Sequence, residues 1–157
     1  MNKTPFELKY LKKTFCFKKF FSSNGSHLFL KNKKWSSWAK TSHSSPKYLH
    51  YPKNEMEILQ IVKHARENKE KVKVFGSSHS LSGITETDGH LISLDKFNKL
   101  IKIDHQNSSV TVESGMRLYQ LNKLIWDHGL SLSTLGAISD QSIAGGKKKI
   151  NKNKSKN

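Results

Sequence analysis

VKVFGSSHSLSG, residues 72–83, is the stretch that decides the fold. It begins as a short strand, with Val72 and Val74 on one face, and turns off that strand at Gly76. Small hydroxyl residues follow at Ser77, Ser78 and Ser80. Successive backbone N–H groups in such a loop form a concavity suited to phosphate oxygens. Neither a Rossmann G-x-G-x-x-G nor a Gly-Lys-Ser/Thr phosphate loop is present, and without further context such a loop is more often structural than functional.

A helix is predicted directly before this strand. Asn54 suits the N-cap, and acidic residues follow in the first turn, where the helix dipole favours negative charge. Apolar residues then repeat at helical spacing, at Ile58, Ile61, Val62 and Ala65. Before the helix, two prolines bound an extended segment in which Tyr48 and His50 share a face. Helix followed by strand indicates an α/β unit.

Further elements are predicted after the loop. Residues 91–94 read as a strand, and 100–104 with 110–114 read as a β-hairpin, because apolar and polar residues alternate on both sides of a polar turn. Gly115 leads into a helix over 116–129, with Gly129 as its C-cap. The segment LSLSTLGAISDQSIAGG, which contains three glycines, follows that helix.

The charge of the chain divides it into three parts. Residues 1–34 hold nine Lys and one Glu, and residues 147–157 hold six Lys and no acid. Residues 35–146 hold thirteen Lys or Arg and eleven Asp or Glu, a balance of only +2 out of a net charge of +16. We therefore expect one folded domain over 35–146, a disordered or targeting extension over 1–34 and a disordered Lys/Asn-rich tail over 147–157.

The basic N-terminal extension leaves the location of the protein open. Its alternating Lys and Phe residues are compatible with a mitochondrial presequence, with an interfacial membrane-binding helix, or with a solvated extension of a cytoplasmic protein. No apolar run approaches the roughly 18 residues needed to cross a membrane. A single cysteine excludes an intrachain disulfide. We expect no specific nucleic-acid partner for either of the two Lys-rich ends.

The segments named above resemble, in order, the FAD-binding domain of the aldonolactone oxidases. This family contains the gulonolactone and D-arabinono-1,4-lactone oxidases and belongs to the vanillyl-alcohol oxidase and p-cresol methylhydroxylase superfamily. The resemblance covers residues 35–146, from WSSWAKTSHSSP through VFGSSHSLSG to LGAISDQSIAGG. It implies an α+β fold, the N-terminal part of a p-cresol methylhydroxylase-type FAD-binding domain, and oxidation of CH–OH groups in sugar lactones or polyols.

The resemblance also implies which residues contact FAD. His79 takes the position of a histidine that bonds covalently to the 8α carbon of the flavin in many members, and an imidazole nitrogen is a competent nucleophile for this. The first loop then lines the diphosphate through Gly76, Ser77, Ser78 and Ser80. A second loop contacts the cofactor through Ala137, Ser142 and Gly145.

The sequence departs from the family after Gly146, where KKKINKNKSKN replaces a glycine- and threonine-rich stretch. We therefore expect a truncated chain without the substrate-binding cap, and its own oxidase activity is in doubt. The alternatives are a non-catalytic remnant that binds no flavin and a basic protein associated with nucleic acid or membranes. Because substrate-polarising residues belong to the cap, no catalytic residue is assigned.

The remaining histidines show no metal-ligand spacing with cysteine or acidic residues, so no metal site is predicted. They are His27, His43, His50, His64, His90, His105 and His128.

Overall fold

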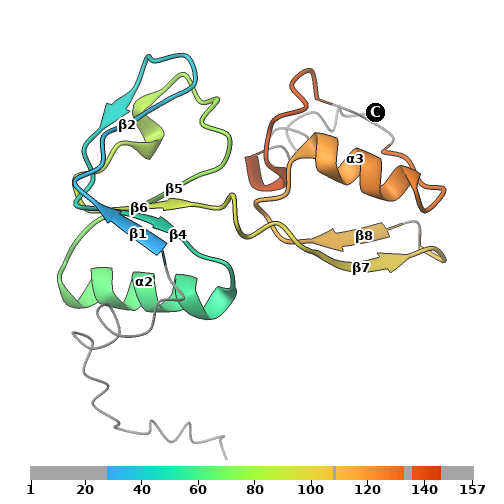
Figure 1. The fold of residues 1–157 in the computed structure, drawn as a ribbon, viewed down its shortest axis with the longest axis horizontal. Helices are drawn as coiled ribbons and strands as arrows, with labels where there is room; N and C mark the ends of the chain where they lie inside the picture. The colour runs from blue at the N-terminus through green and yellow to red at the C-terminus, as the bar shows by residue number, and fades with distance from the viewer. Residues whose placement is uncertain (1–27, 108, 133–135, 146–157) are drawn as a thin grey trace, which may run out of the picture.

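A computed structural model describes residues 28–107, 109–132 and 136–145. The strands are β1 (Leu28–Lys31), β2 (Trp35–Ser36), β3 (His43–Ser44), β4 (Tyr48–Tyr51), β5 (Val72–Phe75), β6 (His90–Ser93), β7 (Leu100–Asp104) and β8 (Ser109–Val112). The helices are α2 (Glu55–Glu67), the short 3-10 helix η1 (Gly83–Thr85) and α3 (Leu118–Trp126). These elements form two lobes, joined by the chain that runs from β6 to β7 (Figure 1).

The first lobe is built on a four-stranded sheet in the order β1-β4-β6-β5. β6 runs parallel to both β4 and β5, and β1 lies antiparallel to β4 on the far edge. α2 covers one face of this sheet, and the β2–β3 hairpin lies on the other side (Figure 1). All four residues of β6 are buried, because this strand lies between two others and beneath the helix.

α2 begins where the sequence predicts. The side chain of Asn54 accepts a hydrogen bond from the backbone N–H of Glu57 at 2.9 Å, which satisfies one of the free donors at the helix N-terminus. The helix buries Ile61 and Ala65, and Ile61 packs with Ile92 of β6 in the core. This contact fixes α2 against the sheet. The next element along the chain is β5, from which the loop beginning at Gly76 leaves.

Asn54→Ala is expected to lower the free energy of unfolding by about 1 kcal/mol, because the N–H of Glu57 loses its acceptor. Urea unfolding followed by circular dichroism measures the change. Gln106→Ala, at an exposed turn position, is the control and should leave the midpoint unchanged. Equal midpoints for Asn54→Ala and the unsubstituted chain would contradict the capping role.

The second lobe consists of the β7–β8 hairpin and α3. The two strands pair antiparallel, as predicted, and the buried side of α3 packs on them through Leu121 and Ile125 with Met116. Gly129 follows the helix with a left-handed φ of 70°, a conformation that favours glycine. The helix itself ends at Trp126, earlier than the predicted limit at Gly129.

The first strand that the structure describes begins before Trp35, where the sequence predicts the start of the folded domain. β1 falls inside the segment 1–34, which was expected to be an extension, and it pairs with β4 along four residues. Phe29 of β1 also packs edge-on against Tyr48 at 5.9 Å between ring centroids. Residues 1–27 and 146–157 lie outside the described residues, and so do the predictions made for them. Among the described residues, no helix combines the length and apolar character required to cross a bilayer.

Gly115 lies at the junction between the two lobes. Its N–H donates to the carbonyl oxygen of Phe97 at 2.8 Å. A Cβ at this position would lie 1.8 Å from the carbonyl oxygen of Leu94 and 2.5 Å from that of Phe97. The chain leaving β8 therefore passes directly against the chain leaving β6, and only glycine allows this approach.

Candidate functional site

The first loop of the candidate site leaves the end of β5 at Gly76. Ser78 adopts a left-handed φ of 59°, and its carbonyl oxygen accepts a hydrogen bond from the N–H of Trp38 at 2.9 Å. In the part of the chain that the structure describes, the backbone N–H groups of 77–80 donate to no acceptor. A left-handed residue among free N–H groups is a geometry that binds anions. The loop therefore has the donors that a diphosphate requires.

His79 lies next to the aromatic ring of Trp38. The ring centroids are 5.1 Å apart with an interplanar angle of 45°, and the histidine is half-buried while Trp38 is 72% exposed. The indole therefore limits the orientations of the imidazole without covering it. The fold of the β2–β3 hairpin brings Trp38 to this loop, a contact that no local pattern in the sequence predicts.

The second predicted loop meets the first at Ser142. A Cβ built on Gly76 would lie 2.0 Å from Ser142 Oγ and 2.9 Å from Ser142 Cβ, so the two residues are in direct contact. Ser142 is itself buried, and Gly145 lies beside it, with a Cβ position 4.0 Å from Ser142 Oγ. The structure thus brings together Gly76, Ser142 and Gly145 from segments that are far apart in the sequence. Ala137 is exposed, and no contact joins it to the first loop among the described residues.

Backbone and side-chain bonds hold the second loop at the start of α3. The N–H of Ile143 donates to the carbonyl of Met116 at 2.9 Å. Arg117, which precedes α3, donates from Nη1 to the carbonyl of Asp140 at 2.9 Å and from Nη2 to the carboxylate of Asp95. Asp95 follows β6, so Arg117 connects the second loop to the first lobe. Sequence reasoning did not single out Arg117, because no local pattern marks a contact of this kind.

The serine side chains of the first loop have separate environments. Ser77 and Ser78 are half-buried, whereas Ser80 is exposed and its Oγ lies 3.1 Å from Ser82 Oγ. Together with the free N–H groups, these hydroxyls give a small, polar and uncharged cradle. Such a cradle is suited to an anion such as a diphosphate, because backbone donors stabilise negative charge without bulk.

The sequence matches a known family model over most of the folded region. Residues 46–146 match the FAD binding domain family. L-gulonolactone oxidase of Mus musculus is 39% identical over 115 residues, which are 73% of this chain and 26% of that protein. D-arabinono-1,4-lactone oxidase of Saccharomyces cerevisiae is 37% identical over 121 residues, covering 74% of this chain and 23% of that protein. The chain thus spans about a quarter of the length of these relatives.

Solved structures agree on the fold. A solvent-stable cholesterol oxidase superposes with a TM-score of 0.66 at 20% identity, over 78% of this chain and 24% of that one. An alkyldihydroxyacetonephosphate synthase superposes with a TM-score of 0.60 at 18% identity, over 65% of this chain and 20% of that one. These matches confirm the predicted α+β class and the p-cresol methylhydroxylase-type domain, of which the N-terminal part is present. The chain belongs to the FAD binding domain family, and FAD is the cofactor of that family.

Proposed function

We propose that this chain is the cofactor-binding part of a flavin-dependent oxidoreductase that oxidises a CH–OH group of a sugar lactone or related polyol. The observation that carries the proposal is the contact of Ser142 with Gly76, because it brings the two loops predicted to hold the cofactor into one site. The oxidases of sugar lactones among its relatives, at 37–39% identity, support the substrate class.

Each loop has a separate role in this proposal. The N–H groups and hydroxyls of 77–80 bind the diphosphate, and Ala137, Ser142 and Gly145 contact the cofactor from the second loop. His79 is the residue to which the flavin ring becomes covalently attached, held in orientation by Trp38. Bound FAD supplies a two-electron acceptor for the hydride of the substrate, and the protein supplies binding and orientation.

His79→Ala is expected to abolish covalent attachment, because it removes the nucleophile. The loop should stay intact, since the imidazole contacts the ring of Trp38 and, within the described residues, carries no hydrogen bond that holds the loop. The tag-free chain is incubated with FAD and precipitated with acid, and visible flavin absorbance is measured in the pellet and the supernatant. Flavin should remain in the pellet of the unsubstituted chain and move to the supernatant for His79→Ala. His105→Ala, an exposed histidine in the second lobe, is the matched control and should retain flavin in the pellet.

Two outcomes would contradict the proposal at different levels. An unsubstituted chain that stays colourless after incubation with FAD would refute cofactor binding by this chain. Flavin that remains acid-resistant in His79→Ala would refute the attachment residue alone. The substrate class is tested by anaerobic addition of D-arabinono-1,4-lactone or L-gulonolactone to the yellow protein: bleaching supports it, and a flavin that stays oxidised contradicts turnover by this chain.

A further inference from the structure

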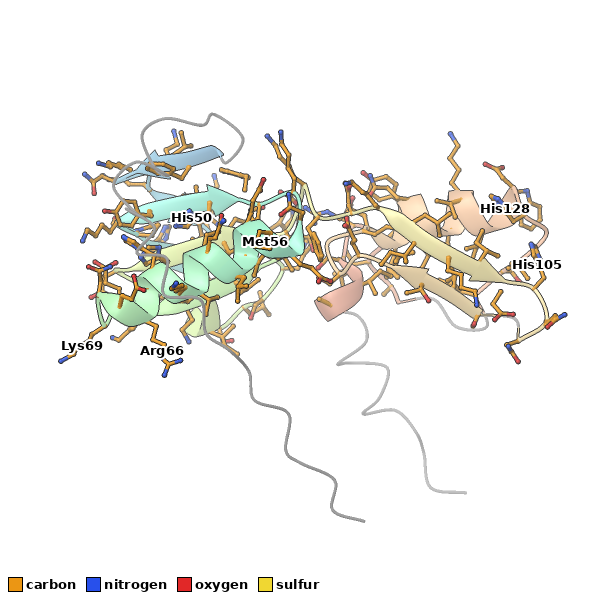
Figure 2. The ribbon with its side chains drawn as sticks, turned by 90° about the horizontal axis from the view of Figure 1, so that it is seen from below. His50, Met56, Arg66, Lys69, His105 and His128 are labelled. Carbon is orange, nitrogen blue, oxygen red and sulfur yellow. The ribbon has the colours of Figure 1, made fainter. Side chains whose placement is uncertain are left out.

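Three histidines and one glutamate gather between the sheet of the first lobe and α2, away from the flavin loops. His50 of β4 and His90 of β6 are fully buried, and His64 extends from the helix towards them. Glu70 lies just beyond the helix, and its side chain is 18% exposed. Figure 2 shows His50 beside α2 in the first lobe, whereas His105 and His128 lie at the far end of the second lobe. Nothing in flavin binding requires this group.

Short hydrogen bonds connect the group into a chain. His50 Nε2 and His90 Nδ1 are 2.8 Å apart, with the two rings stacked at 6°. His90 Nε2 lies 2.6 Å from Glu70 Oε2, and Lys47 Nζ donates to Glu70 Oε1 at 2.5 Å. The ring of His64 stands nearly perpendicular to that of His90, with centroids 5.3 Å apart. His90 thus donates to Glu70 and accepts from His50.

The charge states of these groups follow from their surroundings. The hydrogen bond from Lys47 holds the pKa of Glu70 below its ordinary value, outweighing the opposite effect of burial. Burial lowers the pKa of His90, outweighing the carboxylate of Glu70, which acts to raise it.

We propose that His64, Glu70 and His90 form a binding site for one Zn²⁺ ion. Each offers a ligand atom, and the three atoms all lie within 4.8 Å of one another. Zinc binds imidazole nitrogen at about 2.0–2.1 Å and carboxylate oxygen at about 2.0–2.2 Å, which places tetrahedral ligands about 3.3 Å apart. Small side-chain rotations therefore reach this geometry, with His90 Nε2 and Glu70 Oε2 moving apart from 2.6 Å.

Lys47 and His50 form hydrogen bonds that would orient two of the metal ligands, Glu70 and His90. Lys47 binds Oε1 of Glu70 and leaves Oε2 for the metal. Zinc binding at His90 Nε2 transfers the ring proton to Nδ1, which then donates to His50 Nε2. The proton of His50 moves correspondingly to its own Nδ1, so both rings remain neutral and no proton is lost. A water molecule completes the fourth position.

The ligand types favour zinc over the hard cations. Two imidazoles and one carboxylate suit Zn²⁺, whereas Mg²⁺ and Ca²⁺ prefer sites made of oxygen atoms alone. Because the ligands come from the end of α2, the turn after it and β6, bound zinc would tie the helix to the middle strand. The site would therefore brace the helix against the sheet, independently of the proposed flavin function.

The test uses the full chain without a histidine tag, with Cys16→Ser to remove a competing thiol. Zn²⁺ is titrated against a chromophoric chelator to obtain stoichiometry and affinity, and the unsubstituted site should bind one equivalent. Each of the variants Glu70→Gln and His64→Gln is expected to lower the affinity for Zn²⁺ by about tenfold to a hundredfold. His105→Gln removes an exposed histidine and is the matched control, with unchanged affinity.

Thermal unfolding gives a second readout on the same proteins. Zn²⁺ should raise the Tm of the parent chain and of His105→Gln but not that of His64→Gln, whose helical circular dichroism confirms folding. Equal zinc affinity in the parent chain and both ligand variants would overturn the proposal, and so would an absence of zinc binding by the folded parent chain. FAD binding does not enter this assay, so failure here leaves the flavin proposal standing.

Discussion

Gly115→Ala is expected to lower the free energy of unfolding by about 3 kcal/mol, the upper part of the range for an overpacked buried site. The added Cβ would lie 1.8 Å from the carbonyl oxygen of Leu94 and 2.5 Å from that of Phe97. Both obstacles are backbone atoms, so no side-chain rotation relieves them and the chain between the lobes must move. The N–H of Gly115 then also loses its bond to Phe97. Chemical unfolding measures the loss.

Gly136→Ala provides the control for this substitution. A Cβ on Gly136 meets only side-chain atoms at 3.7 and 3.8 Å, which is ordinary van der Waals contact. Its effect should stay within about 0.5 kcal/mol, as is usual for exposed positions. If the two alanine variants unfold at the same denaturant concentration, Gly115 does not lie as close to the backbone of Leu94 and Phe97 as the structure places it.

Gly76→Ala is expected to weaken FAD binding about a hundredfold, because separating the loops removes a hydrogen bond to the charged diphosphate that contributes about 1.5–3 kcal/mol. The new Cβ would lie 2.0 Å from Ser142 Oγ and 2.9 Å from Ser142 Cβ, so the two loops must separate. Equilibrium titration with FAD in the His79→Ala background, where no covalent bond forms, measures the affinity by flavin fluorescence.

A second substitution tests the cause. Ser142→Gly removes both atoms that the alanine would meet, so the Gly76→Ala/Ser142→Gly double variant should recover much of the lost affinity. Ser142→Gly alone shows what the serine contributes and completes the cycle. A double variant no better than Gly76→Ala would show that the contact between these residues does not cause the loss.

Local signals in the sequence account for α2, α3, β5, β6 and the β7–β8 hairpin. Asn54 predicts the start of α2, and alternating residues predict the β7–β8 hairpin, because caps and short turns depend on neighbouring residues. The resemblance of the loop after β5 to a known family supplied the cofactor residues, of which Gly76, Ser142 and Gly145 do come together. Ala137 stays apart from the first loop in the described residues.

Contacts between distant segments were not predictable from local patterns. β1 carries no strong strand signal, and it becomes a strand because the edge of β4 offers it hydrogen-bonding partners. The histidine group was missed for the same reason, since His64, Glu70 and His90 show no ligand spacing along the chain. The available signal was the histidine at position 50 in a segment predicted to be extended, where alternate side chains face the interior.

The strand order of the first lobe has a consequence for the timing of folding. β4, α2 and β5 are all synthesised before β6, yet β6 lies between β4 and β5 and pairs with both. A nascent chain ending before His90 therefore exposes two strand edges separated by the width of the missing strand. The β7–β8 hairpin, by contrast, closes over a short loop and forms quickly. Chaperone capture and strand exchange during translation should concentrate on the interval before residues 90–93 leave the ribosome, and decline once they do.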